Sequence, residues 1–162
     1  MKKYLVILLP LMLVLFSGCP VGLDHALGES GKEKIDNRLI GTWHSTSTES
    51  EVQRVTLEEK DAHSYTVKVV ERGEMYSLET DDLQGWVTSV KEKNFVYFKP
   101  DGEEKYYHYC YWFDGSTLIT CDLALLDGGV DEVKDTKSLR AQVERSMVKD
   151  EWGNETIEWV QE

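Results

Sequence analysis

The chain has 162 residues, of which 30 are acidic and 18 are basic, so its formal net charge is −12 at pH 7. A body with this charge repels polyanions, which excludes nucleic acid as an expected partner. Hydrophobic residues make up 41% of the chain and aromatic residues 10%, a composition that excludes an intrinsically disordered protein. We therefore expect one domain with its own core.

The N-terminus has the pattern of a secretory signal peptide. Two lysines precede an apolar run, residues 5–16. As a helix this run would cover roughly 18 Å, which is too short to span a hydrocarbon core of about 30 Å. The small residues Ser17 and Gly18 follow it, as small residues do before a cleavage site. We therefore expect residues 1–18 to be a signal peptide that is removed on export.

The sequence Phe16-Ser17-Gly18-Cys19 resembles the bacterial lipobox, whose cysteine is acylated and becomes the first residue of the mature protein. The resemblance implies a lipoprotein that is anchored in the cell envelope by palmitate or similar chains on Cys19. Pro20 stands where an aspartate tends to retain such proteins in the inner membrane. This favours the outer membrane, facing the periplasm or the surface, in an organism with two membranes. Ordinary secretion with a free cysteine is the alternative.

Residues 19–36 show no sustained hydrophobic period, and Gly, Glu, Lys and Asp dominate them. We interpret the segment as a lipidated, flexible tether with a reach of roughly 20–25 Å. Such a tether would hold the folded domain, residues 37–162, clear of the membrane.

The middle of the chain consists of short stretches in which apolar and polar residues alternate, the pattern of half-buried strands. In residues 63–74, for example, Tyr65, Val67 and Val69 fall on one face. Turn signals such as the Pro-Asp-Gly sequence at residues 100–102 separate the stretches. The expected strands are residues 39–47, 52–61, 63–74, 75–80, 83–90, 95–99, 105–113 and 116–123.

Strands this numerous, joined by short turns, pair most simply in sequential antiparallel order. An open sheet would expose unpaired edges, and closure into a barrel removes them. The expected fold is therefore mainly β, an antiparallel meander closed into a barrel of about eight strands.

A helix and one more strand follow the meander. Leu139, Val143 and Met147 recur at i, i+4 and i+8, which is the stripe of an amphipathic helix. Asp135 or the next residue can cap the start of this helix. Residues 155–161 alternate again, and we expect them to form the final strand.

Two cysteines remain once Cys19 is acylated: Cys110 and Cys121. Asp114-Gly115 between them is a hairpin turn signal, and a reversal centred there sets the two cysteines opposite each other. An exported protein meets oxidising conditions, which makes the pair a candidate disulfide. The alternative is two small buried thiols.

Gly41-Thr42-Trp43, at the start of the first expected strand, resembles the G-x-W signature of lipocalins. The resemblance implies that Gly41 permits a tight turn and that Trp43 packs across the closed end of a barrel. The late helix before a final strand also suits small bacterial lipocalin-like lipoproteins, so the resemblance covers residues 37–162. The final strand carries no arginine, where the family usually stacks a cation on the tryptophan.

Aromatic residues concentrate in residues 105–113, where alternate tyrosines share one face. Inward hydroxyls beside apolar walls would suit a ligand that is mostly apolar with a few polar points. The alternative is that the rings fill the interior, because a barrel of eight strands is only just wide enough to hold side chains. If a cavity exists, the residues expected near it are Tyr65, Trp86, Tyr97, Tyr107, Tyr109 and Tyr111.

Nothing in the sequence has the spacing of a catalytic or metal site. Acidic pairs beside turns, such as Glu103-Glu104, are expected to be solvated. We therefore expect a non-enzymatic, lipid-anchored envelope protein, without cofactor or metal, that binds a small apolar or amphipathic ligand. The alternative is a structural or assembly module that binds a partner protein in the envelope.

Overall fold

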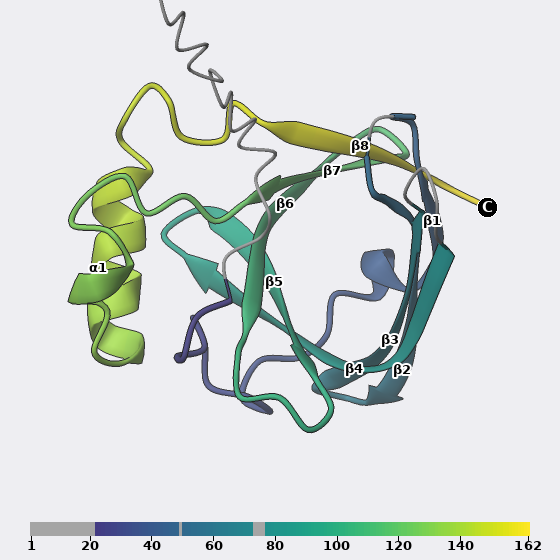
Figure 1. Cartoon of the computed structure of the whole chain (residues 1–162), viewed down its shortest axis with the longest axis horizontal. Coiled ribbons are helices and arrows are strands. Elements are labelled where there is room, and N and C mark those ends of the chain that lie inside the picture. The colour runs from purple at the N-terminus through teal and green to yellow at the C-terminus, as the bar shows by residue number, and fades with distance from the viewer. Residues whose placement is uncertain (1–21, 49, 73–76) are drawn as a thin grey trace, which may run out of the picture.

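The structure is a computed structural model, which describes residues 22–48, 50–72 and 77–162 (Figure 1). The predicted signal peptide and the predicted acylation site, Cys19, lie outside these residues. In the described part of the chain, no helix is both long enough and apolar enough to cross a membrane.

Eight antiparallel strands close into a barrel, in which each strand pairs with the next and β8 returns to pair with β1 (Figure 1). The fold is mainly β, and the predicted closed meander with one late helix and a final strand is confirmed. The strands are β1 (Gly41–Ser45), β2 (Val52–Asp61), β3 (Ser64–Arg72), β4 (Ser77–Val90), β5 (Lys93–Pro100), β6 (Tyr107–Asp114), β7 (Thr117–Asp122) and β8 (Thr156–Gln161).

β4 is a single strand where the sequence predicted two. Val67 and Val69 of β3 pair with Leu83 and Thr80 of β4, so β4 contains one extra residue between these pairs. A β-bulge of this kind bends a strand without ending it. The polar residues that look like a turn in the sequence are therefore absorbed within the strand.

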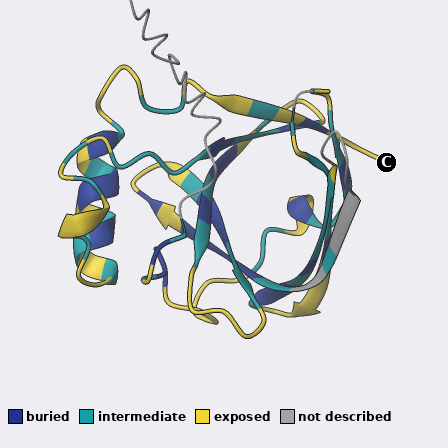
Figure 2. Ribbon diagram, in the orientation of Figure 1, coloured by how far each residue is buried: buried dark blue, intermediate teal, exposed yellow. Residues whose placement is uncertain are grey.

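Alternate residues of the strands form the core of the barrel, and Figure 2 shows how far each residue along the strands is buried. On β3, for instance, Tyr65 and Val67 are fully buried, as the two-residue period of a strand requires. The buried residues of this core are Leu39, Trp43, Leu57, Tyr65, Val67, Val87, Val96, Tyr111, Leu118 and Trp159.

One end of the barrel is closed by a short 3₁₀ helix, η1 (Asn37–Leu39), and by Trp43. The Trp43 side chain is buried, and its Nε1 donates a hydrogen bond to the Leu39 carbonyl at 2.9 Å. Gly41 lies between them with a φ of +138°. This backbone conformation, which favours glycine, lets the chain turn sharply from η1 into β1.

We expect Gly41→Ala to lower the free energy of unfolding by about 1–2 kcal/mol, because alanine is strained at this φ. An added Cβ would also collide with the Gln161 Nε2, which is held by a 3.0 Å hydrogen bond to the Ile40 carbonyl. Urea unfolding measures the loss, and the double variant Gly41→Ala/Gln161→Ala separates the collision from the backbone strain. An unchanged midpoint in the single variant would contradict this account.

Helix α1 (Thr136–Ser146) packs on the outside of the barrel. Leu139 and Val143 of the predicted stripe are fully buried, in a second core cluster with Phe95 and both described cysteines. Asp135 caps the helix, as predicted: its carboxylate accepts from the Ser138 N–H at 2.7 Å. The helix therefore covers the outer face of the strands next to it.

Residues 22–36 pack against the barrel and do not form the predicted flexible tether. Leu23 and Tyr106 exchange two backbone hydrogen bonds, of 2.9 and 2.8 Å. Leu27 is fully buried, and its N–H donates to the Nε2 of His108 at 3.1 Å. The tether prediction is therefore wrong for the described part of this segment.

Composition misled that prediction, because polar residues and glycine outnumber the apolar residues of the segment. Its buried residues, Leu23, Ala26 and Leu27, nevertheless cluster against the outer face of the barrel. Farther along, the Thr88 hydroxyl donates to the Glu33 carboxylate at 2.5 Å. The folded body thus includes the residues from 22 onward, ahead of the predicted boundary.

Candidate ligand-binding site

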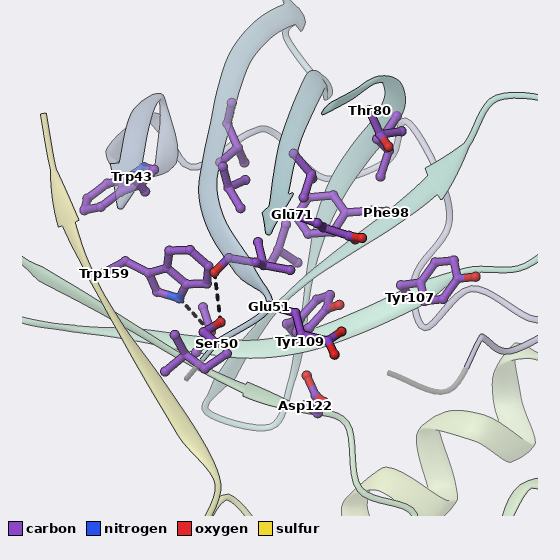
Figure 3. Close-up of a pocket in the computed structure, with 18 of the residues that line it drawn as sticks. Trp43, Ser50, Glu51, Glu71, Thr80, Phe98, Tyr107, Tyr109, Asp122 and Trp159 are labelled. Atoms are coloured by element: carbon purple, nitrogen blue, oxygen red, sulfur yellow. Dashed lines mark hydrogen bonds between the residues drawn. The ribbon is translucent and has the colours of Figure 1, made fainter. Parts of the chain in front are cut away.

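An open cavity of about 570 Å³ lies inside the barrel (Figure 3). Its mouth is at the end of the barrel opposite η1, because residues at the strand ends there line it: Val52, Glu71, Pro100, Tyr107 and Asp122. Six of the ten buried core residues also line the cavity, among them Leu39 of η1 and Trp43, so the cavity reaches the closed end. Of the two alternatives from the sequence, a cavity and a packed interior, the described barrel has the cavity.

Apolar side chains form the floor and walls of the cavity. Leu39 and Trp43 lie at the floor, and Trp159 enters from β8. The Trp159 Nε1 donates to the Thr120 hydroxyl at 2.9 Å, so the polar atom of this ring is already satisfied. The other apolar lining residues include Val55, Leu57, Val69, Val96, Phe98 and Leu118.

Four acidic residues, Glu51, Glu71, Glu103 and Asp122, line the cavity toward its mouth. They come from separate elements: Glu51 precedes β2, Glu71 belongs to β3 and Asp122 ends β7 (Figure 3). The described lining includes no lysine, arginine or histidine. No three His, Cys, Asp or Glu side chains of the described residues gather into a group that could hold a metal ion.

Burial changes the ionisation of the groups at this mouth. It raises the pKa of Asp122, and the negative charge of Glu155 raises it further. Burial also raises the pKa of Tyr109, with a smaller contribution from the charge of Asp122 and from Glu71. Tyr109 is therefore a neutral hydroxyl at pH 7, which can donate a hydrogen bond to a bound molecule.

Tyr65 and Tyr111, two of the predicted ligand-binding residues, lie at the closed end and do not line the cavity. The Tyr65 hydroxyl accepts from the Asp36 N–H at 2.7 Å and donates to the Asp36 carbonyl at 3.0 Å. The Tyr111 hydroxyl donates to the Asp36 carboxylate at 3.0 Å. Burial opposes ionisation of this carboxyl, but hydrogen bonds from Arg38 and Tyr111 outweigh it and lower the pKa of Asp36. The network fixes the closed end of the site.

The closed end also contains a cation near Trp43, supplied by η1. The Arg38 guanidinium carbon lies 4.7 Å from the centroid of the Phe113 ring. That centroid is 6.1 Å from the centroid of the Trp43 ring. The Phe113 ring therefore lies between the Arg38 guanidinium and the Trp43 ring at the closed end.

Trp86 and Tyr97, also predicted to lie near the cavity, are on the outer face of the barrel, and that prediction is wrong. Their rings stack with centroids 5.6 Å apart, in a cluster with Ala26. Val96 and Phe98, the neighbours of Tyr97, turn inward instead and line the cavity.

Tyr107 and Tyr109 are the predicted residues that the structure does bring to the cavity. Sequence reasoning missed the two tryptophans of the floor and wall, and all four acidic residues of the mouth. A usable signal existed for two of the acids. Glu71 has the same parity as Val69 on β3, and Asp122 has the same parity as Thr120 on β7, so strand alternation would have placed each carboxylate on the same face as a residue that lines the cavity.

Comparison with models of known protein families, with curated proteins and with solved structures gives no match. The chemistry of the cavity is therefore the basis for the functional proposal below.

The two cysteines outside the N-terminal segment pair directly across β6 and β7, in the register that the sequence predicted. Both Cys110 and Cys121 are buried and are free thiols in the structure. A hydrogen bond from one thiol to the other and burial raise the pKa of Cys110.

We expect the protein, produced with its N-terminal segment and purified without reductant, to resist alkylation at Cys110 and Cys121 even when denatured. Oxidation would join two sulfurs that the strand register already holds opposite each other. Reduction should then lower the free energy of unfolding by about 2 kcal/mol. Mass spectrometry after alkylation checks this prediction, with the Cys110→Ala variant as the control that cannot form the bond. Full alkylation of both cysteines would contradict it.

Proposed function

We propose that this protein binds a small apolar or amphipathic molecule inside its barrel. The observation that carries the proposal is the open, apolar-walled cavity of about 570 Å³. Ligand pockets usually have volumes of about 300–1,000 Å³, mostly apolar walls and a few polar groups. The Asp36 network and the buried Trp43 hold the closed end in place before a ligand binds, which reduces the cost of ordering the site.

We propose further that acyl chains on Cys19 hold the protein at the cell envelope. Gly22, where the described body begins, lies beside the cavity mouth: a Cβ added there would be 3.0 Å from the Lys105 Cβ and 3.3 Å from the Tyr107 Cζ. Three residue steps connect Cys19 to Gly22, a reach of roughly 10 Å at most. An anchor at Cys19 would therefore keep the mouth close to the membrane, where amphipathic molecules partition.

The proposed role is binding without catalysis, and it competes with one alternative from the sequence, a module that binds a partner protein. That alternative expected a filled interior, so the cavity favours the ligand. Trp112 and Val160, which are 36% and 46% exposed on the outside of the barrel, provide the apolar surface that a partner protein would use.

The cavity proposal predicts saturable binding of a neutral hydrophobic dye, N-phenylnaphthylamine, followed by dye fluorescence. Val69→Trp places an indole in the cavity, and we expect it to weaken dye binding by at least about tenfold. The indole occupies space that the dye needs, and the contact area that the dye then loses with the apolar walls is worth more than about 1.4 kcal/mol. Val148→Trp is the matched control, since Val148 is 83% exposed. The absence of saturable dye binding to the unmodified protein would refute the proposal. Equal losses of dye affinity in the two variants would show that the dye binds outside the cavity.

The anchor proposal predicts that cells producing the protein attach labelled palmitate to it and that Cys19→Ala abolishes the label. Cys121→Ala is the control and should keep the label, because that cysteine is buried in the folded body. Label retained in Cys19→Ala would place the acyl chains on another residue.

A further inference from the structure

The charged groups of the cavity all have one sign. Every charged residue of the described lining is acidic, and these four residues converge on the mouth from separate elements. In the described part of the chain, none of the four carboxylates is in an ion pair, and none accepts a hydrogen bond. A mouth of this kind attracts a positive charge and repels a negative one.

Other carboxylates of the folded body do have cationic partners. Asp36 binds the Arg38 guanidinium at 2.7 Å, and Glu144 binds the Lys91 ammonium at 3.2 Å. Asp127 is held by Arg145 of α1. Inside the cavity, the described groups around the mouth carboxylates are apolar walls, hydroxyl groups and one another. Glu103 also borders an outer pocket that contains Lys60 and Lys99.

Asp122 is the best placed of the four. Its carboxyl is partly buried at the end of β7, near Tyr109 and Glu155. An ionised carboxylate that is withdrawn from water without a cation raises the free energy of the empty site. A cation bound beside it would remove that penalty, and the ring faces of Tyr107 and Tyr109 would add a favourable cation–π contact.

We propose that the cavity selects cationic amphiphiles, with the apolar tail against Trp43 and Trp159 and an ammonium group between Asp122 and Glu71. This inference rests on the proposed function, since it names the class of ligand for the same cavity. It also excludes fatty acids as preferred ligands. Their carboxylate would meet negative charges at the mouth, and only hydroxyl groups would be available to bind it.

Three probes with one tail test the proposal: dodecyltrimethylammonium, dodecanol and dodecanoate, each below its micelle concentration. Displacement of N-phenylnaphthylamine measures their affinities. We expect the ammonium to bind about tenfold more tightly than the alcohol, as coulombic attraction to the carboxylates and cation–π contact predict, and the carboxylate to bind most weakly. Equal affinities for ammonium and alcohol, or a preference for the carboxylate, would overturn this inference and leave the proposed function standing. Failure of all three to bind would overturn both.

Variants that replace one carboxylate by its neutral amide test whether the mouth causes the preference for the cationic probe. Glu71→Gln and Asp122→Asn keep the shape of the mouth, and each should weaken dodecyltrimethylammonium binding by about tenfold, because each removes one negative charge that attracts the cation. Dodecanol affinity should not change, and this also shows that the variants are folded. Glu92→Gln is the matched control, because Glu92 is exposed on the turn between β4 and β5, at the opposite end of the barrel. An equal loss in Glu92→Gln would mean that net charge, and not the mouth, attracts the cation.

Discussion

Replacement of Leu27 by alanine is expected to lower the free energy of unfolding by about 2–5 kcal/mol, the range for a buried leucine whose removal leaves a cavity. Leu27 is fully buried, in the core cluster that includes Phe95 of the barrel and Leu139 and Val143 of α1. The methyl groups removed by the substitution therefore lie where three parts of the chain meet, and none of these parts can easily collapse into the space. Urea unfolding followed by circular dichroism measures the change.

Leu126→Ala is the matched control, because Leu126 is 38% exposed. We expect that substitution to change the free energy of unfolding by no more than about 0.5 kcal/mol. If Leu27→Ala were equally mild, residues 22–36 would be the flexible tether that their composition suggests. The proposed anchor at Cys19 would then no longer hold the cavity mouth close to a membrane.

The fold could be predicted because its signals are local. The register of β6 and β7 follows from the turn at Gly115, which has a φ of +60°, and it correctly sets Cys110 opposite Cys121. The unbroken β4 could not be predicted in the same way. Its bulge is visible only once β3 lies beside it, so the information is in the partner strand and not in the segment itself.

The lining of the cavity was harder to predict, because alternation shows which residues share a face but not which face turns inward. On β5 both faces are buried. Val96 and Phe98 point into the cavity, and Tyr97 packs outside beneath Ala26. A covered outer face removes the contrast between apolar and polar residues on which the sequence prediction depends. The sequence does not predict that residues 22–36 cover this face, because they have the composition of a linker.

The acidic mouth was missed for a different reason. Acidic residues beside turns are usually solvated, and the sequence predicts a solvated carboxylate at Glu103. Closure of the barrel gathers the strand ends into a rim, so residues next to turns, such as Glu103 and Asp122, become the entrance to a cavity. Only the closed topology reveals that these carboxylates face a common space.

A second large effect is expected from pH, through the buried His108. This side chain is 3% exposed, and burial lowers its pKa to about 4. Its Nε2 accepts the Leu27 N–H, so the neutral ring carries its proton on Nδ1, and a second proton would destroy that acceptor. In the unfolded chain the pKa of histidine is about 6.5. Below this pH the unfolded state therefore takes up a proton that the folded state resists.

The contribution to stability is complete above pH 6.5 and is lost as the pH falls from about 6.5 to about 4. At about 1.36 kcal/mol per pKa unit, this loss is about 3 kcal/mol. The carboxyl of Asp36, whose pKa is lowered in the fold, also loses its contribution at acid pH. The test must therefore compare two proteins that share this carboxyl.

His108→Gln keeps an acceptor for the Leu27 N–H and removes the titration. We expect the unfolding free energies of the unmodified protein and of this variant to converge by about 3 kcal/mol between pH 7 and pH 4. Parallel curves would show that folding does not lower the pKa of His108. Amide exchange at Leu27, corrected for the intrinsic effect of pH, gives a second measurement. In the unmodified protein we expect this exchange to accelerate on acidification before global unfolding. The proton that charges the His108 ring breaks the hydrogen bond from the Leu27 N–H, which holds this part of residues 22–36 on the barrel.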